Sequence, residues 1–315
     1  MDSVGPAGSA GSKGSVGSKG SVGSKGSGRA ARSAGDAAGA AGAGVRALRR
    51  RKLLVLAARL GVAAVFIGGW QLVTTLGWLD PFFFGQPSGI AQRLGEYFSQ
   101  GSQATEFGSY WTQIGTTLRE ALFGFVLGSL TGVVFGVALG QNRFLADVLG
   151  PYIKIVNAIP RIVLGSIFVV AFGIGETPKV LLAAVLVFFV VFFNAFQGVR
   201  EVDRNILDNA RVLGAKPLQI VRHVVVPSAL TWIIASLHTA FGFAVVGALV
   251  GEVLGAQSGL GLVIKTAQNS FDPNGVFATM FVIAVIAVTA EWLITKLERR
   301  LLSWRPPAPS ESAAI

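Results

Sequence analysis

The chain has 315 residues, of which 52% are hydrophobic and 14% are charged, whereas ordinary soluble domains carry about 25% charged residues. This composition excludes a typical soluble enzyme. The chain has no cysteine, which excludes a disulfide framework, a thiolate nucleophile and cysteine-ligated metal; with only two histidines present, we expect no metal site. The formal net charge is +11, but ten of the 27 basic residues precede Leu53, so the rest of the chain is close to balanced.

The first 52 residues differ from the rest of the chain. They hold the hexad GSKGSV twice, at 11–16 and 17–22, then Gly/Ala-rich sequence and the basic run RALRRRK at 46–52. Because such sequence cannot bury enough apolar surface to offset the entropy of ordering, we predict a disordered basic tail over residues 1–52. A basic cluster beside a hydrophobic span is typical of the cytoplasmic side and of contact with membrane lipid. No aromatic platform accompanies the hexads, so we expect no nucleic-acid partner.

Six apolar stretches follow, and each was compared with the roughly 20 residues that cross about 30 Å of hydrocarbon. They cover residues 60–79, 121–139, 149–174, 180–196, 230–250 and 276–294. The third is the weakest, because only 162–174 is cleanly apolar and Pro160 predicts a kink or break within it. The pattern predicts an all-α integral membrane protein with about six transmembrane helices, in a domain covering 53–304 that is followed by a C-terminal tail over 305–315.

The basic residues indicate the orientation of these spans, because loops rich in Lys and Arg remain in the cytoplasm. With six crossings, one side holds the run at 46–52 together with Arg143, Arg200, Arg204, Arg211, Lys216, Arg222, Lys296, Arg299, Arg300 and Arg305. The other side holds few, namely Arg93, Lys179 and Lys265. Without the third span, the central basic cluster and the N-terminal run would fall on opposite sides. We therefore predict six spans with both termini in the cytoplasm.

Glycine recurs every fourth residue along the second span, at Gly124, Gly128, Gly132, Gly136 and Gly140. At about 100° per residue these glycines form one slowly winding ridge, where the backbone of another helix can approach closely. The ridge serves either packing within the chain, which we favour, or a dimerisation seam.

The long loop after the fourth span, residues 200–230, has the pattern of two short helices. Asp203 is a plausible N-cap, and apolar residues follow it at helical spacing. Gly214 predicts a break, because glycine readily adopts the left-handed conformation that ends a helix. Pro217 can begin a second helix, and Pro227 is expected to stop it before the next span. The loop is therefore predicted to be a helix–turn–helix at the membrane surface.

This loop resembles the "EAA" signature of the membrane subunits of ABC importers, which reads EAA, three residues, Gly, nine residues, then I-x-L-P. The aligned positions, with both spacings kept, are Asp208, Asn209, Ala210, Gly214, Val224, Val226 and Pro227. Asp208 replaces the glutamate of the signature and Asn209 replaces an alanine. Segments 159–182, 198–215 and 251–269 are similar, in order, to the permeases of nitrate, sulfonate and taurine uptake. The resemblance covers about residues 60–304.

The resemblance implies an importer core at about 112–300, in a multi-pass protein of a prokaryotic-type cytoplasmic membrane. It implies that the loop over 200–227 couples the chain to two ATP-binding subunits, that a second copy completes a homodimer, and that an extracytoplasmic solute-binding protein delivers a small solute, an anion of the nitrate, sulfonate or taurine type. The sequence itself contains no Gly-Lys dipeptide and hence no phosphate-binding loop. We expect no catalytic residues and no bound cofactor, with ATP and magnesium used by the partner ATPase.

Polar residues within the spans are candidates for the translocation pathway, because a central charge costs roughly 2.5 to 3.5 kcal/mol on insertion scales. They are Asn194, His238, Glu252 and Arg161. Glu252 lies near the predicted outer end, where it is either solvated or in contact with a gate. His238 either lines the pathway or is held by a neighbouring helix. Arg161 either attracts an anionic substrate or has a structural role.

Two other classes of function were weighed. A self-contained secondary transporter or channel is the alternative, although such proteins more often have two homologous halves or discontinuous helices around midplane charges, of which the weak third span is the only sign. An intramembrane enzyme would need paired aspartates or an HExxH motif, and neither is present. Copurification of an ATPase subunit would separate the importer from both.

Overall fold

The computed structural model describes residues 27–101, 105–255 and 257–301, in which the regular elements are helices. Residues 1–26 and the predicted C-terminal tail at 305–315 lie outside the described residues. Helix α1 covers Ser27–Thr75 and so begins inside the segment predicted to be disordered. The alanines between 30 and 47 favour this, because alanine has the highest helix propensity. The chain divides into two compact units, residues 1–66 and 67–315.

Five helical segments are long and apolar enough to cross a membrane. They are Leu53–Thr75 within α1, α4 at Tyr110–Gln141, α7 at Glu176–Arg200, Pro217–Gly255, which contains α9 at Pro217–Ile220 and α10 at Val226–Gly255, and α12 at Pro273–Leu301 without its last residue. The shorter helices are α2 at Pro81–Phe84, α3 at Pro87–Ser99, α5 at Arg143–Ala158, α6 at Arg161–Phe172, α8 at Arg204–Val212 and α11 at Leu260–Asn269.

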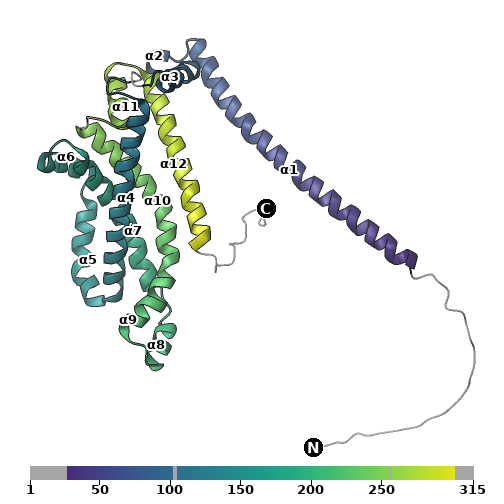
Figure 1. Cartoon of the computed structure of the whole chain (residues 1–315), viewed down its shortest axis with the longest axis vertical. Helices are drawn as coiled ribbons and strands as arrows, with labels where there is room; N and C mark the ends of the chain where they lie inside the picture. Colours follow the sequence, from purple (N-terminus) through teal and green to yellow (C-terminus); the bar gives the residue numbers. More distant parts are fainter. Residues whose placement is uncertain (1–26, 102–104, 256, 302–315) are drawn as a thin grey trace, which may run out of the picture. The chain divides into compact units, whose positions relative to one another are not determined.

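Helices α4 and α7 pack side by side along their length through the glycine ridge (Figure 1). Successive glycines of α4 meet successively later residues of α7, from Gly124 beside Ala183 to Gly140 beside Val199, so the two helices are parallel. A Cβ atom built on Gly136 would lie 2.7 Å from the Cβ of Ala195. The ridge therefore packs within the chain, as favoured from the sequence.

The third apolar stretch forms two helices separated by a break. Helices α5 and α6 pass the test for a span only together, and they are bent by 85° at a break that contains Pro160. The predicted break at this proline is confirmed. Because α4 and α7 are parallel, the chain must return to its starting face between them, and α5 with α6 makes this return. Counted with this bent pair, the described residues hold up to six candidate membrane spans, the number predicted.

Helix α10 runs antiparallel to α7, since Gly251 contacts Lys179 near the start of α7 whereas Trp232 contacts Gly198 near its end. The core lies where α4, α7 and α10 meet. Its fully buried members are Ala121, Val187, Val191, Ala240, Ala244 and Ala248. Small residues dominate this list, which allows the three backbones to approach closely.

Short helices close the end of the bundle opposite the 200–227 segment. Arg93 of α3 forms an ion pair with Asp272, just before α12, at 2.7 Å. Tyr97 of α3 stacks on Tyr110 at the start of α4, with ring centroids 4.6 Å apart. Burial raises the pKa of Tyr97 above its usual value. These contacts attach α3 to both α4 and the start of α12.

We predict that Gly136→Ala lowers the thermal stability of the purified protein by about 1–3 kcal/mol, because the added Cβ overpacks the α4–α7 contact. Gly115→Ala on the same helix is the matched control, since a Cβ there meets nothing within 4 Å. The control should be neutral or stabilising, because alanine favours a helix over glycine by about 0.5–1 kcal/mol. Equal effects of the two substitutions, measured by thermal unfolding in detergent, would contradict the packing.

Candidate functional site

The segment at 200–227 folds as two short helices, as predicted. Helix α8 is capped by Asp203, whose side chain accepts a hydrogen bond of 2.8 Å from the backbone N–H of Asn205. The turn after α8 contains Gly214 with φ 81°, in the left-handed region that glycine tolerates. Helix α9 starts at Pro217, where the missing N–H needs no partner. These are the local signals on which the prediction depended.

The expected stop at Pro227 is wrong. Helix α9 continues through a single π-helical turn at Val221–Val225 into α10, so Pro227 lies inside a continuous helical segment. A proline within a helix lacks a donor and crowds the carbonyl four residues earlier, and the wider turn directly before it relieves this clash. The second short helix is therefore rigidly joined to α10.

The inner face of the segment packs on the ends of α7 and α10. Ile220 and Val225 are buried against Ala195, Val199 and Ala229. Two of the seven aligned residues, Ala210 and Val224, are half-buried against this cluster. Val226 is half-buried, whereas Asp208, Asn209, Gly214 and Pro227 are exposed. Asp208 forms an ion pair with Arg211 at 2.7 Å.

The outer face of the segment exposes large apolar side chains. Val212 is 87% exposed, Leu213 86% and Leu218 77%. These three residues flank the turn between α8 and α9, at the tip farthest from the α4–α7–α10 core (Figure 1). An apolar tip on a well-packed base is typical of a surface that contacts another protein.

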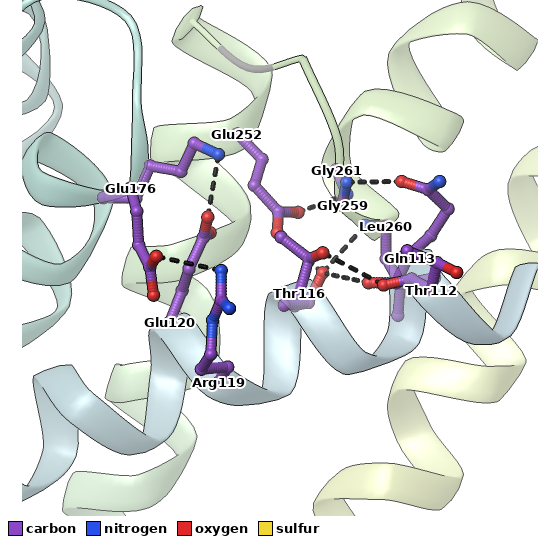
Figure 2. A network of polar contacts seen from close by, with 12 residues as sticks. Thr112, Gln113, Thr116, Arg119, Glu120, Glu176, Glu252, Gly259, Leu260 and Gly261 are labelled. Carbon is purple, nitrogen blue, oxygen red and sulfur yellow. Dashed lines mark hydrogen bonds and ion pairs between the residues drawn. The ribbon is translucent and has the colours of Figure 1, made fainter. Parts of the chain in front are cut away.

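A buried polar network at the opposite end of the bundle was missed from the sequence, apart from Glu252. The carboxylate of Glu252 accepts hydrogen bonds of 2.6 Å from the Thr117 hydroxyl and from the Gly261 N–H. The Thr117 oxygen accepts from the Leu260 N–H at 2.8 Å, and the Gln113 amide oxygen accepts from the Gly259 N–H at 2.7 Å. Figure 2 shows Gln113 of α4 and Glu252 of α10 directed at the start of α11, where Gly259, Leu260 and Gly261 lie.

Glu252 is fully buried, so of the two alternatives considered for it the solvated one is wrong. Its carboxylate binds the backbone at the start of α11. Its neighbour Glu120 is 1% exposed and pairs with Lys179 of α7 at 2.8 Å. By contrast, Arg119 and Glu176 form an exposed pair one residue away, at 2.9 Å (Figure 2). No local pattern could have found the network, because its partners are up to 146 residues apart in the chain.

The remaining candidate pathway residues lie apart from this network. His238 of α10 lies between two carboxylates of α12, with Nδ1 2.7 Å from Glu291 and Nε2 3.1 Å from Glu298. Asn194 donates to the carbonyl of Val190 in its own helix at 2.8 Å. Arg161 donates to Asn157 at 3.1 Å across the break between α5 and α6. Among the described residues, no hydrogen bond joins any two of the four candidates.

Comparison with known proteins identifies the family. Residues 104–303 match the model of the binding-protein-dependent transport system inner membrane component. The chain belongs to this family. This permease is 31% identical to the putative aliphatic sulfonates transport permease protein SsuC of Bacillus subtilis (strain 168), over 77% of its length and 85% of the relative's. It is 29% identical to the taurine transport system permease protein TauC of Escherichia coli (strain K12), over 78% and 88% of the two chains.

A third relative transports a different solute. The riboflavin transport system permease protein RibX of Chloroflexus aurantiacus is 32% identical over 82% of this permease and 94% of the relative. A solved structure of the MetNI methionine ABC transporter in an inward facing conformation covers 65% of this permease and 95% of that chain, with a TM-score of 0.51 and 20% identity. At this identity the likeness concerns the fold.

The protein is a multi-pass permease subunit of an ABC importer in the cytoplasmic membrane. Its family implies ATP-binding subunits that use ATP, and a substrate-binding protein that delivers the solute. Its relatives are permease subunits, a class that generally lacks an ATPase site of its own. The alternative of a self-contained transporter or channel is disfavoured by the same comparisons.

We predict that Lys179→Met destabilises the permease by about 3–5 kcal/mol, because it leaves the buried carboxylate of Glu120 without its partner. Adding Glu120→Gln should recover much of the loss, since no uncompensated charge then remains. Arg119→Gln, which breaks the exposed pair with Glu176, should cost at most about 1 kcal/mol. Thermal unfolding of these variants and the wild type tests the prediction. If the effects of Lys179→Met and Glu120→Gln on the free energy of unfolding simply add in the double variant, the two side chains do not form a buried pair.

Proposed function

We propose that the permease transmits the movements of two partner ATPase subunits to its membrane helices through the segment at 200–227. The exposed tip formed by Val212, Leu213 and Leu218 supports this, because it offers apolar area for a partner on a base that is itself packed. The continuous helical segment from Pro217 to Gly255 supports it too, since a displacement of α9, which carries Leu218, is passed directly into α10. Asp208, Asn209 and Gly214 are exposed on this segment and belong to the proposed contact.

Both chain ends lie in the cytoplasm in this proposal. Helices α4, α7 and α12 end on the face where α8 and α9 lie, and this face carries Arg143, Arg200 and Arg300. The side chain of Gln71 accepts from the Ser88 N–H, and Trp70 packs on Phe277 near the start of α12, so the apolar part of α1 ends on the opposite face. In this proposal the basic run at 46–52 is cytoplasmic, because segments rich in Lys and Arg remain on that side of the membrane.

The permease functions as a homodimer in this proposal, because one chain supplies one coupling segment and two ATPase subunits must be engaged. An extracytoplasmic solute-binding protein delivers the solute to the face opposite the coupling segment. Membrane lipid surrounds the exposed apolar helices. ATP and magnesium are bound by the partner subunits.

The proposed solute is a small anion of the nitrate, sulfonate or taurine type. The named sulfonate and taurine relatives support this class of solute. The riboflavin relative has comparable identity, so the solutes named for the relatives are not restricted to such anions. Within the chain, Arg161 is the candidate that fits an anion best. Its Nε is buried without a hydrogen-bond partner among the described residues, at the point where the α5–α6 span is broken. Asn194, His238 and Glu252 complete the proposed pathway residues, although the contacts described above satisfy each of them within the chain.

We expect Leu213→Asp to abolish copurification of the ATPase subunit and to lower ATP-dependent uptake more than tenfold. Burying the new carboxylate in an apolar contact with the ATPase costs free energy, so the contact is lost. The side chain is 86% exposed in the permease, so folding is unaffected. Phe83→Asp, at a 69% exposed phenylalanine of α2 on the opposite face, is the control and should retain the ATPase. Normal ATPase recovery with Leu213→Asp would refute the coupling role.

We expect Arg161→Gln to reduce uptake of taurine or an alkanesulfonate at least about tenfold, because a charge-assisted hydrogen bond to an anion contributes about 1.5–3 kcal/mol. Basal ATP hydrolysis by the assembled transporter should be unchanged. Arg161→Lys should keep part of the uptake, since it retains the charge without the fork of donors. Equal uptake by the wild type and the glutamine variant would remove Arg161 from the pathway.

A further inference from the structure

An apolar groove runs between α5 and α7 toward the face that carries the coupling segment. It has a volume of about 420 Å³, and the side chains of Phe192, Phe193 and Phe196 form its α7 wall. Its α5 wall includes Ile153, Pro151 and Gly150. Phe192 is eight residues before the end of α7 at Arg200, so the groove extends roughly 12 Å into the span at 1.5 Å per residue. It therefore reaches most of the way through one leaflet of about 15 Å.

A second cavity, which shares the lining residue Arg200 with the groove, is rich in arginine. It has a volume of about 800 Å³, and its lining comes from the ends of α4 and α7, the start of α5 and the coupling segment at 200–227. Arg143, Arg200 and Arg211 line it, with Asp208 as the acidic residue. Asp208 is already paired with Arg211 at 2.7 Å. Among the described residues, Arg143 and Arg200 have no carboxylate within 4.0 Å, so the cavity has an excess of positive charge.

Arg200 joins the two spaces, because it lines both of them. Its guanidinium lies over the ring of Phe196, 5.2 Å from the ring centroid, which holds the charge at the mouth of the groove. Lys154 and Asp147 of α5 also line the groove, and their charges cancel. The combined space thus has an apolar slot of acyl-chain depth that opens into a cationic pocket.

We propose that this space binds an anionic phospholipid of the cytoplasmic leaflet, with its phosphate at Arg143 and Arg200 and an acyl chain between α5 and α7. The leaflet follows from the orientation proposed above; the site itself depends only on the two cavities. Basic pockets between transmembrane helices at the cytoplasmic surface suit anionic headgroups, and the apolar slot excludes a ligand that is only an anion.

The bound headgroup would lie between the ends of the membrane helices and the coupling segment, which contributes Leu207, Arg211 and Ile220 to the cavity wall. A lipid at this position therefore contacts both the moving segment and the helices that it moves. Lipid occupancy of the site is therefore measured in the assembled transporter, with the full-length permease and its ATPase subunits together.

The experiment measures phospholipid retention by native mass spectrometry, after purification from nanodiscs of phosphatidylcholine with or without phosphatidylglycerol. We expect retained phosphatidylglycerol in the wild type, and a loss of about fivefold for each of Arg143→Gln and Arg200→Gln. Arg143→Lys/Arg200→Lys should keep the lipid, because the charge is preserved. Arg300→Gln is the matched control, since it removes an exposed arginine from the end of α12 on the same face and lines neither cavity.

Four results of this retention assay would overturn the proposal. They are unchanged retention in the glutamine variants, equal loss in Arg300→Gln, equal retention of phosphatidylcholine, and displacement of the lipid by soluble glycerol phosphate, which would indicate a site for a free anion. Because the chain has no cysteine, Phe193→Cys adds one reporter in the groove. Disulfide cross-linking between two such copies would assign the groove to a dimer contact instead. Recovery of the ATPase in the same preparations reports on the proposed coupling function separately.

Discussion

The close contact between α4 and α7 is the constraint on which the rest of the structure depends. Two parallel helices cannot follow one another directly in the chain, so this contact requires the intervening segment to cross back. The broken α5–α6 span makes that crossing despite its proline and its polar residues. The glycine ridge therefore determines more than local packing, because it requires the chain between α4 and α7 to return to the face at which α4 starts.

The same contact explains how charged residues are tolerated in the bundle. Because small residues bring α4, α7 and α10 close together, Lys179 reaches Glu120 and Thr117 reaches Glu252 without leaving space for lipid or solvent. A buried ion pair of this kind is weak support for stability, since desolvation offsets much of the attraction, but an unpaired charge at the same place would be costly. The network thus specifies which helices meet, and at which register, at the end of the bundle remote from the coupling segment.

At the other end of the bundle the packing leaves side chains exposed. The coupling segment rests on the last turns of α7 and the first turns of α10 and leaves its own tip uncovered. A π-helical turn admits Pro227 without interrupting the helix, so α9 and α10 form one continuous helical segment. The bundle is therefore tied at one end by hydrogen bonds to the start of α11 and exposes apolar side chains at the other end. This asymmetry suits a subunit that receives motion from one side and responds on the other.

The sequence alone determined the features that depend on neighbours in the chain. Hydropathy predicted the spans, and Pro160 predicted the break in the third of them. Asp203, Gly214 and Pro217 predicted the two short helices, and the four-residue spacing of glycine predicted the ridge. The family resemblance, carried by the segment around Asp208 and Gly214, was confirmed by comparison. Only the tertiary structure decided that the ridge faces α7, that Pro227 continues a helix, and that Glu252 is buried on a backbone turn and His238 lies between two carboxylates. The reason is physical: the ridge, Glu252 and His238 have partners more than fifty residues away in the chain, and a sequence pattern records the polarity of a side chain but not what it meets.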